Sequence, residues 1–177
     1  MNVFTSDVPD DTKLDIVETL RPLKWKRDLS TVHSKLIQCG WKLFRIGEDV
    51  DIVYDRDIYI HRLKSYVIKI QKSGMPQTQR EWQIWKQWKG TIVGDYLASI
   101  YWQGYLAGHF SIVMEKLVVT SDLGFYCYGS HDDYDDDDYM KHALVEIANL
   151  LIHILHVSEP QIGHTKNGIW KVYDYGF

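Results

Sequence analysis

Two ionisable side chains lie in sequence surroundings that are unusual for a charge. Lys69 interrupts the apolar run YVIKI, residues 66–70, which has the composition of a strand. A lysine that faces inward from such a strand is costly unless an anion meets its ammonium group. Asp174 ends the alternating segment VYD and is followed by Tyr-Gly. An aspartate at a strand end beside a glycine is well placed to present a carboxylate to a metal ion. Together the two residues suggest chemistry that involves an anion and a cation.

The densest group of charges is HDDYDDDDY, residues 131–139, which contains six aspartates. It lacks the glycine and the terminal bidentate glutamate of a calcium-binding loop. A solvated loop is the commonest explanation of such a run, and an acidic docking site for a basic partner is the alternative. His153 and His156 are three residues apart with no third ligand in view, and neither Cys39 nor Cys127 belongs to a CxxC or Cys/His metal pattern.

The charge balance argues against nucleic acid as a partner. The formal net charge is −4, and without the six clustered aspartates the remaining 20 basic and 18 acidic residues give +2. The one compact basic cluster, KWKR at residues 24–27, is too short to follow a phosphate backbone. Only two cysteines are present, the N-terminus lacks the features of a signal peptide, and the longest apolar segment is too short to span a bilayer. We therefore expect a soluble, cytoplasmic protein with no membrane association.

The first part of the chain is expected to be a leader followed by a helix and several strands. Residues 1–29 are mixed and polar, which predicts a loose leader with at most a short helix. A helix is expected next, capped by Ser30 or Thr31 and ended by Gly40. The period then changes to that of strands with no helix between them, which indicates an antiparallel meander. The expected strands cover residues 41–46, 51–55, 57–63 and 65–71.

The second part of the chain returns to helical spacing. Residues 78–88 carry a tryptophan at every third position, which predicts a helix. Residues 100–117 read as two strands joined at AGH. After the aspartate-rich segment, residues 138–156 carry an apolar stripe typical of a long helix, and the chain closes on a hairpin with a type I′ turn at Asn167-Gly168. The order of elements predicts an α+β fold.

This order, with several short motifs in place, resembles the protein kinase-like family, in a reduced form similar to small kinase-like proteins of phages and other viruses. YVIKI is similar to the family's Val-Ala-Ile-Lys strand, so the resemblance implies that Lys69 contacts the α- and β-phosphates of ATP and pairs with a helix glutamate. Glu81, in the following helix, is the candidate partner. RIGEDVDIVY, residues 45–54, resembles the phosphate-covering loop, although Gly47 stands alone and Asp49 and Asp51 occupy positions where further glycines are expected.

The resemblance extends to the adenine contact and the metal site. FSIVMEKL, residues 110–117, looks like the family's fifth strand and hinge. Met114 would lie behind the adenine, and backbone groups of Glu115 to Leu117 would bond its edge. VYDYG resembles Asp-Phe-Gly, which implies that Asp174 binds Mg²⁺.

The catalytic loop departs from the family pattern. Counting back from Asp174 with the family's interval places the metal-binding asparagine at Gln161 and the catalytic aspartate at His156. A rival register aligns HVS, residues 156–158, with His-Arg-Asp and leaves Ser158 for the aspartate, with Glu159 beside it. Neither register supplies an aspartate, so we expect weak phosphoryl transfer or none.

The resemblance implies a fold with three parts. Residues 1–29 form the leader, residues 30–117 a kinase-like N-lobe with a five-stranded antiparallel sheet and one helix, and residues 118–177 a linker and a truncated C-lobe with one long helix and a hairpin. The expected function is that of a pseudokinase-like protein that binds a protein partner, a host protein in the host cytoplasm if the source is viral, with ATP and Mg²⁺ in its cleft. The alternatives are a minimal Ser/Thr kinase-like phosphotransferase and an acidic decoy acting through residues 131–139.

Overall fold

The structure is a computed structural model, which describes residues 3–5, 8–44, 56–72, 76–118, 149, 153 and 161–173. The chain divides into two compact units, one made of Met1–Trp82 with Ser99–Lys116 and the other of Gln83–Ala98 with Leu117–Phe177. The structure is α+β with an antiparallel sheet, as the sequence predicts. None of the helices within the described residues is long and apolar enough to cross a membrane.

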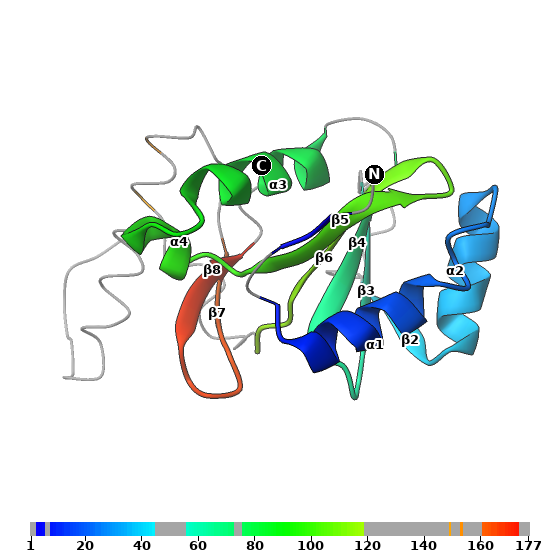
Figure 1. The fold of residues 1–177 in the computed structure, drawn as a ribbon, viewed down its shortest axis with the longest axis horizontal. Coiled ribbons are helices and arrows are strands. Elements are labelled where there is room, and N and C mark those ends of the chain that lie inside the picture. The colour runs from blue at the N-terminus through cyan, green and yellow to red at the C-terminus, as the bar shows by residue number, and fades with distance from the viewer. Residues whose placement is uncertain are drawn as a thin grey trace. The chain divides into compact units, whose positions relative to one another are not determined.

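The first unit is built on a six-stranded antiparallel sheet with the strand order β1-β5-β6-β4-β3-β2 (Figure 1). Five of these strands are those expected from the sequence, and the sixth, β1, pairs with β5 at one edge. The strands are β1 (Val3–Phe4), β2 (Trp41–Phe44), β3 (Arg56–His61), β4 (Tyr66–Gln71), β5 (Ile100–Leu106) and β6 (His109–Glu115). The two-residue turn between β5 and β6 has positive φ at Ala107 (50°) and Gly108 (81°), which is the type I′ geometry.

Two helices cover one face of this sheet, α1 (Asp10–Leu20) and α2 (Leu29–Gln38). Alternate residues of each strand face them, because successive side chains of a strand point to opposite sides. The resulting core is built from apolar side chains of α1, the segment after it, α2 and the sheet: Ile16, Leu20, Leu23, Val32, Leu36, Trp41, Tyr59, Tyr66, Ile68, Ile70, Trp102, Leu106 and Val113. This face of the sheet is therefore closed without any contribution from Lys69.

The expectation of a loose leader is wrong, because the first 29 residues contribute a strand, an 11-residue helix and part of the core. Ile16, Leu20 and Leu23 are buried at 0%, 7% and 1% exposure, with the i, i+4, i+7 spacing of one helix face. A contact between two side chains ties α1 to the sheet. The hydroxyls of Thr19 and Tyr66 are 2.9 Å apart, and burial raises the pKa of Tyr66, so that its hydroxyl stays protonated.

The opposite face of the sheet carries Lys69. Across β4 and its neighbours, Lys69 is directly paired with Ile58 of β3 and Ile112 of β6, so these residues share a face. Helix α3 (Gln77–Trp88) follows β4 along the chain, and its first residues belong to the first unit. The Gln71 side chain at the end of β4 accepts a hydrogen bond from the Thr78 backbone N–H at 2.9 Å. This contact satisfies one of the free amides at the start of the helix.

The second unit contains α4 (Ile92–Asp95) and a hairpin of β7 (Gln161–His164) and β8 (Trp170–Tyr173). The hairpin is found where the sequence predicts it, but its turn is not type I′, since Gly168 (φ 79°) has positive φ and Asn167 does not. Thr165 and Ile169 close a three-residue loop through a 2.8 Å backbone hydrogen bond, a geometry that needs only one left-handed residue. The long helix expected over residues 138–156 lies outside the described residues, apart from Asn149 and His153, which are helical.

Helix α2 begins two or three residues earlier than expected, with Asp28 as its N-cap in place of Ser30 or Thr31. The Asp28 carboxylate accepts hydrogen bonds from the Ser30 hydroxyl (2.6 Å) and from the Thr31 backbone N–H (2.7 Å) and hydroxyl (2.7 Å). These bonds favour the charged form and lower the pKa of Asp28 to about 2. Gly40, with φ 86°, follows the helix as predicted.

We predict that Asp28→Ala lowers the melting temperature of the protein by a few degrees at pH 6, because the helix loses its N-cap. The folded-state pKa lies below the ordinary value of 3.8, so the carboxylate stabilises the fold above that pH and loses this effect as the pH falls to about 2. In thermal melts from pH 6 to pH 2, the difference from wild type should therefore shrink on acidification. Asp11→Ala, in the first turn of α1, is the control, and a difference for Asp28→Ala that is constant over this pH range would contradict the assignment.

Candidate functional site

The candidate site is a buried ion pair between strand β4 and helix α3. The Lys69 ammonium Nζ is 2.7 Å from Oε1 of Glu81, and their side chains are 3% and 0% exposed. Lys69 points to this side because Ile68 and Ile70, its neighbours in β4, point into the core against α1 and α2. The pairing of Lys69 with Glu81 expected from the sequence is present in the structure.

The register of the sheet places a second cation on the same carboxylate. Arg56, at the start of β3, is paired with Gln71 and lies two positions from Ile58, so it shares the face of Lys69. Its Nη1 is 3.4 Å from Oε2 of Glu81, and the Arg56 side chain is 5% exposed. Each carboxylate oxygen of Glu81 therefore meets one cation, which compensates for burial of the charge. Sequence reasoning missed Arg56, because its role depends on the pairing register of β3 and β4, and a charged residue at a strand start gives no sign of that register.

Helix α3 presents Glu81 from its buried side. Glu81, Ile84 and Trp85 are 0%, 5% and 4% exposed, with the i, i+3, i+4 spacing of one face. The three-residue spacing of tryptophans, which predicted the helix, identifies only Trp85 among these three buried residues. Thr78, one turn before Glu81, is also fully buried, and its hydroxyl Oγ1 has no hydrogen-bond partner.

Two of the residues expected to contact adenine lie in the same sheet as Lys69. Met114 lies in β6, two positions from Ile112, the residue that pairs with Lys69. It therefore shares the face of Lys69, and it is 1% exposed. The backbone N–H of Glu115 donates to Ser99 at 2.8 Å, and that of Lys116 donates to Ser65 at 2.9 Å. These two amides are engaged within the protein, so they offer no donor to the edge of a base.

The other predicted site residues belong to the second unit or lie outside the described residues. Leu117 follows β6 and belongs to the second unit, as does Gln161, which begins β7 and pairs through its backbone with Tyr173. Gly47, His156 and Asp174 lie outside the described residues. No cluster of three or more His, Cys, Asp or Glu side chains suited to a metal ion occurs in the described part of the chain.

Comparison with known proteins does not assign the chain to a family. No protein-family model matches it, and no curated protein matches it at a significant level. The kinase-like interpretation therefore depends on the motifs of the sequence and on the geometry around Lys69.

We predict that Lys69 and Glu81 are energetically coupled. Removal of one member of a buried pair typically costs about 3–5 kcal/mol, because the remaining charge is left without its partner. In a double-mutant cycle with Lys69→Met and Glu81→Gln, urea denaturation should show a coupling energy of at least about 1 kcal/mol. The matched control is the partly exposed pair Lys64–Asp15, for which a cycle should give less than about 1 kcal/mol. Additive effects in the Lys69–Glu81 cycle would show that the contact contributes nothing.

Proposed function

We propose that the chain is a kinase-like nucleotide-binding protein, in which Lys69 contacts the phosphates of ATP and Glu81 orients it. The observation that carries the proposal is the buried 2.7 Å pair between Lys69 on strand β4 and Glu81 on the next helix, α3. Protein kinases use a pair of this kind, strand lysine to helix glutamate, to position the phosphates. Stability alone gives little reason for this pair, because two apolar side chains in place of a buried ion pair often leave the fold equally stable.

The chain order supports the same proposal. Three antiparallel strands, the helix α3 with the short helix α4 after it, and two further strands follow one another from β2 to β6, with β4 and β6 adjacent in the sheet. The fold places Lys69 and Met114 on one face, as expected if the first contacts phosphates and the second lies behind the base. Mg²⁺ would be held by Asp174, with Gln161 as a weaker neutral ligand.

Within this class, the protein is best described as pseudokinase-like. Neither alignment of the catalytic loop supplies an aspartate, since His156 or Ser158 takes its place. A serine is a poor base at neutral pH, and phosphoryl transfer depends on the position of every group around the reacting phosphate. We propose that the protein acts by binding, with nucleotide as a ligand and another protein as its partner, rather than by transfer of phosphate. The phosphotransferase alternative predicts transfer of the γ-phosphate that is lost in Lys69→Met.

We predict that saturating ATP with Mg²⁺ raises the melting temperature of the intact chain. At a ligand concentration of about 100 times Kd the stabilisation is about 2.7 kcal/mol, which corresponds to roughly 5–10 °C for a chain of this size. Lys69→Met should abolish the shift, because it removes the cation that meets the phosphates. Lys72→Met is the matched control, since Lys72 follows the same strand, is partly exposed and pairs with Asp57 at 3.1 Å.

The result separates the proposal from its alternatives. No shift at saturating ATP, or an equal shift in Lys69→Met and wild type, would rule out the nucleotide site. Transfer of radiolabel from γ-labelled ATP to a protein substrate by the wild type, absent in Lys69→Met, would replace the pseudokinase-like description with that of an active phosphotransferase. Replacement of the six aspartates of residues 131–139 by asparagine should leave the ATP-induced shift intact.

A further inference from the structure

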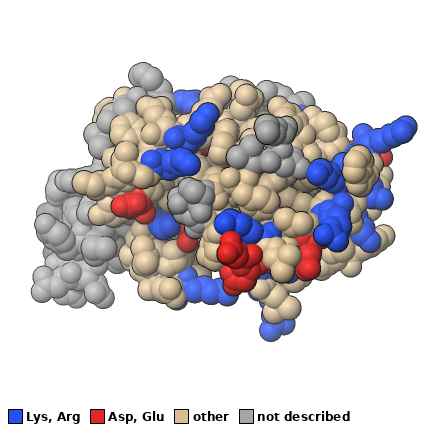
Figure 2. Space-filling model, viewed as in Figure 1, with Lys and Arg blue, Asp and Glu red and all other residues tan. Residues whose placement is uncertain are grey.

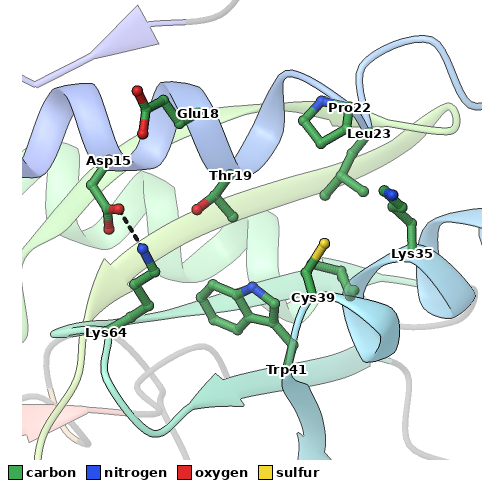
Figure 3. Close-up of a pocket in the computed structure, with 10 residues that line it drawn as sticks. Asp15, Glu18, Thr19, Pro22, Leu23, Lys35, Cys39, Trp41 and Lys64 are labelled. Carbon is green, nitrogen blue, oxygen red and sulfur yellow. Dashed lines mark hydrogen bonds and ion pairs between the residues drawn. The ribbon is translucent and has the colours of Figure 1, made fainter.

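A second candidate site lies within the first unit, on the face of the sheet away from Lys69. It is a pocket of about 230 Å³ between α1, α2 and the start of β2 (Figure 3). Its lining combines apolar side chains, four charged residues and a thiol: Asp15, Glu18, Thr19, Pro22, Leu23, Lys35, Leu36, Cys39, Trp41 and Lys64. The volume lies below the roughly 300–1,000 Å³ of pockets for drug-sized ligands, so the occupant is a smaller molecule.

Trp41 provides an unpaired hydrogen-bond donor to this pocket. The side chain is buried, at 3% exposure, and its ring is held between His61 and Tyr66, with centroid distances of 5.4 Å and 5.6 Å. No acceptor for the indole N–H occurs among the described residues, and Figure 3 shows the nitrogen on the edge of the ring that faces the pocket. The indole N–H is therefore open to the pocket and can donate to an acceptor on a ligand that enters it.

The charges around the pocket favour an anion. Lys64 forms an ion pair with Asp15, which neutralises that carboxylate, whereas Lys35 has no carboxylate partner within the described part of the chain. The remaining acid, Glu18, is exposed, and Figure 3 shows its carboxylate directed away from Trp41. The ammonium group of Lys35 is therefore available to pair with an anion on the α2 side of the pocket.

The surroundings of the pocket are basic as well. The connection between α1 and α2 carries four Lys or Arg residues, namely Arg21, Lys24, Lys26 and Arg27, and Figure 2 shows basic side chains gathered at the end of the molecule where α2 lies. Clustered charges of one sign raise the local concentration of a ligand of opposite sign and speed its association. The same basic residues repel a positively charged ligand, which would therefore bind poorly.

We propose that the pocket binds a small amphipathic carboxylate. Its carboxylate accepts from the Trp41 indole N–H and pairs with the Lys35 ammonium, and its short aliphatic part packs against Leu23 and Leu36. This binding is independent of the nucleotide site proposed at Lys69, because Trp41 belongs to the core face of the sheet and Lys69 to the other. Failure of one proposal therefore leaves the other unaffected.

Cys39 offers a direct readout of occupancy, because its thiol is free and exposed and lines the pocket. In the intact chain with Cys127→Ser, the rate of Cys39 alkylation by iodoacetamide is measured by mass spectrometry with and without 4-methylpentanoate. At a carboxylate concentration of ten times Kd the rate should fall about tenfold, since only the unoccupied fraction reacts. The neutral analogue 4-methylpentan-1-ol, matched in its carbon skeleton, should protect far less.

Variants test which groups hold the carboxylate. Lys35→Met and Trp41→Phe should each lose most of the protection, whereas Lys42→Met, next to Trp41 but exposed and outside the pocket, should retain it. Lys35 lies on the surface of a helix, so its variant remains informative if Trp41→Phe fails to fold. Absence of protection by the carboxylate, equal protection by the alcohol, or full protection in Lys35→Met would each overturn the proposal.

Discussion

The burial of three charges between the sheet and α3 is the constraint on which the candidate site depends. Glu81 is fully buried and contacts Lys69 through one oxygen and Arg56 through the other. One carboxylate on α3 is therefore bound to both β3 and β4. Desolvation of such groups is compensated only when the geometry is good, which ties the position of α3 to the register of the two strands. An arrangement of this kind fixes a lysine in a single orientation, as a phosphate-binding role requires.

The two faces of the sheet serve different purposes in this account. The face covered by α1 and α2 holds the apolar core, and a small polar-rimmed pocket opens beside Trp41 at its edge. The other face carries Arg56, Lys69 and Met114 in one register. Because side chains alternate along each strand, the register that buries the apolar residues on one face also sets the charged residues on the other. A shift of β4 by one residue would move its core side chains to the charged face and Lys69 into the core.

The sequence predicts the strands well, because they follow from local periodicity, and it predicts the contact between Lys69 and Glu81 through its resemblance to the kinase-like pattern of a strand lysine and a helix glutamate. A lysine in an apolar strand requires an anion, and the next helix offers a glutamate. The sequence predicts less well the features that depend on contacts between distant segments. The contribution of α1 to the core is marked only by the spacing of Ile16, Leu20 and Leu23 in an otherwise polar segment, and the contact of Arg56 depends on strand register. The hydrogen bonds that make Asp28 the N-cap are local, yet Ser30 and Thr31, which also favour N-caps, follow it directly.

The central claim is that Lys69 lies beside the phosphates of a bound nucleotide. An acyl phosphate derivative of ATP tests this most directly. The neutral amine of a lysine next to the phosphates attacks the acyl carbon and ATP is released, and peptide mass spectrometry then identifies the acylated residue. The account predicts that Lys69 is acylated, and that an excess of ATP with Mg²⁺ prevents the reaction. Labelling confined to exposed lysines and unchanged by ATP would contradict it.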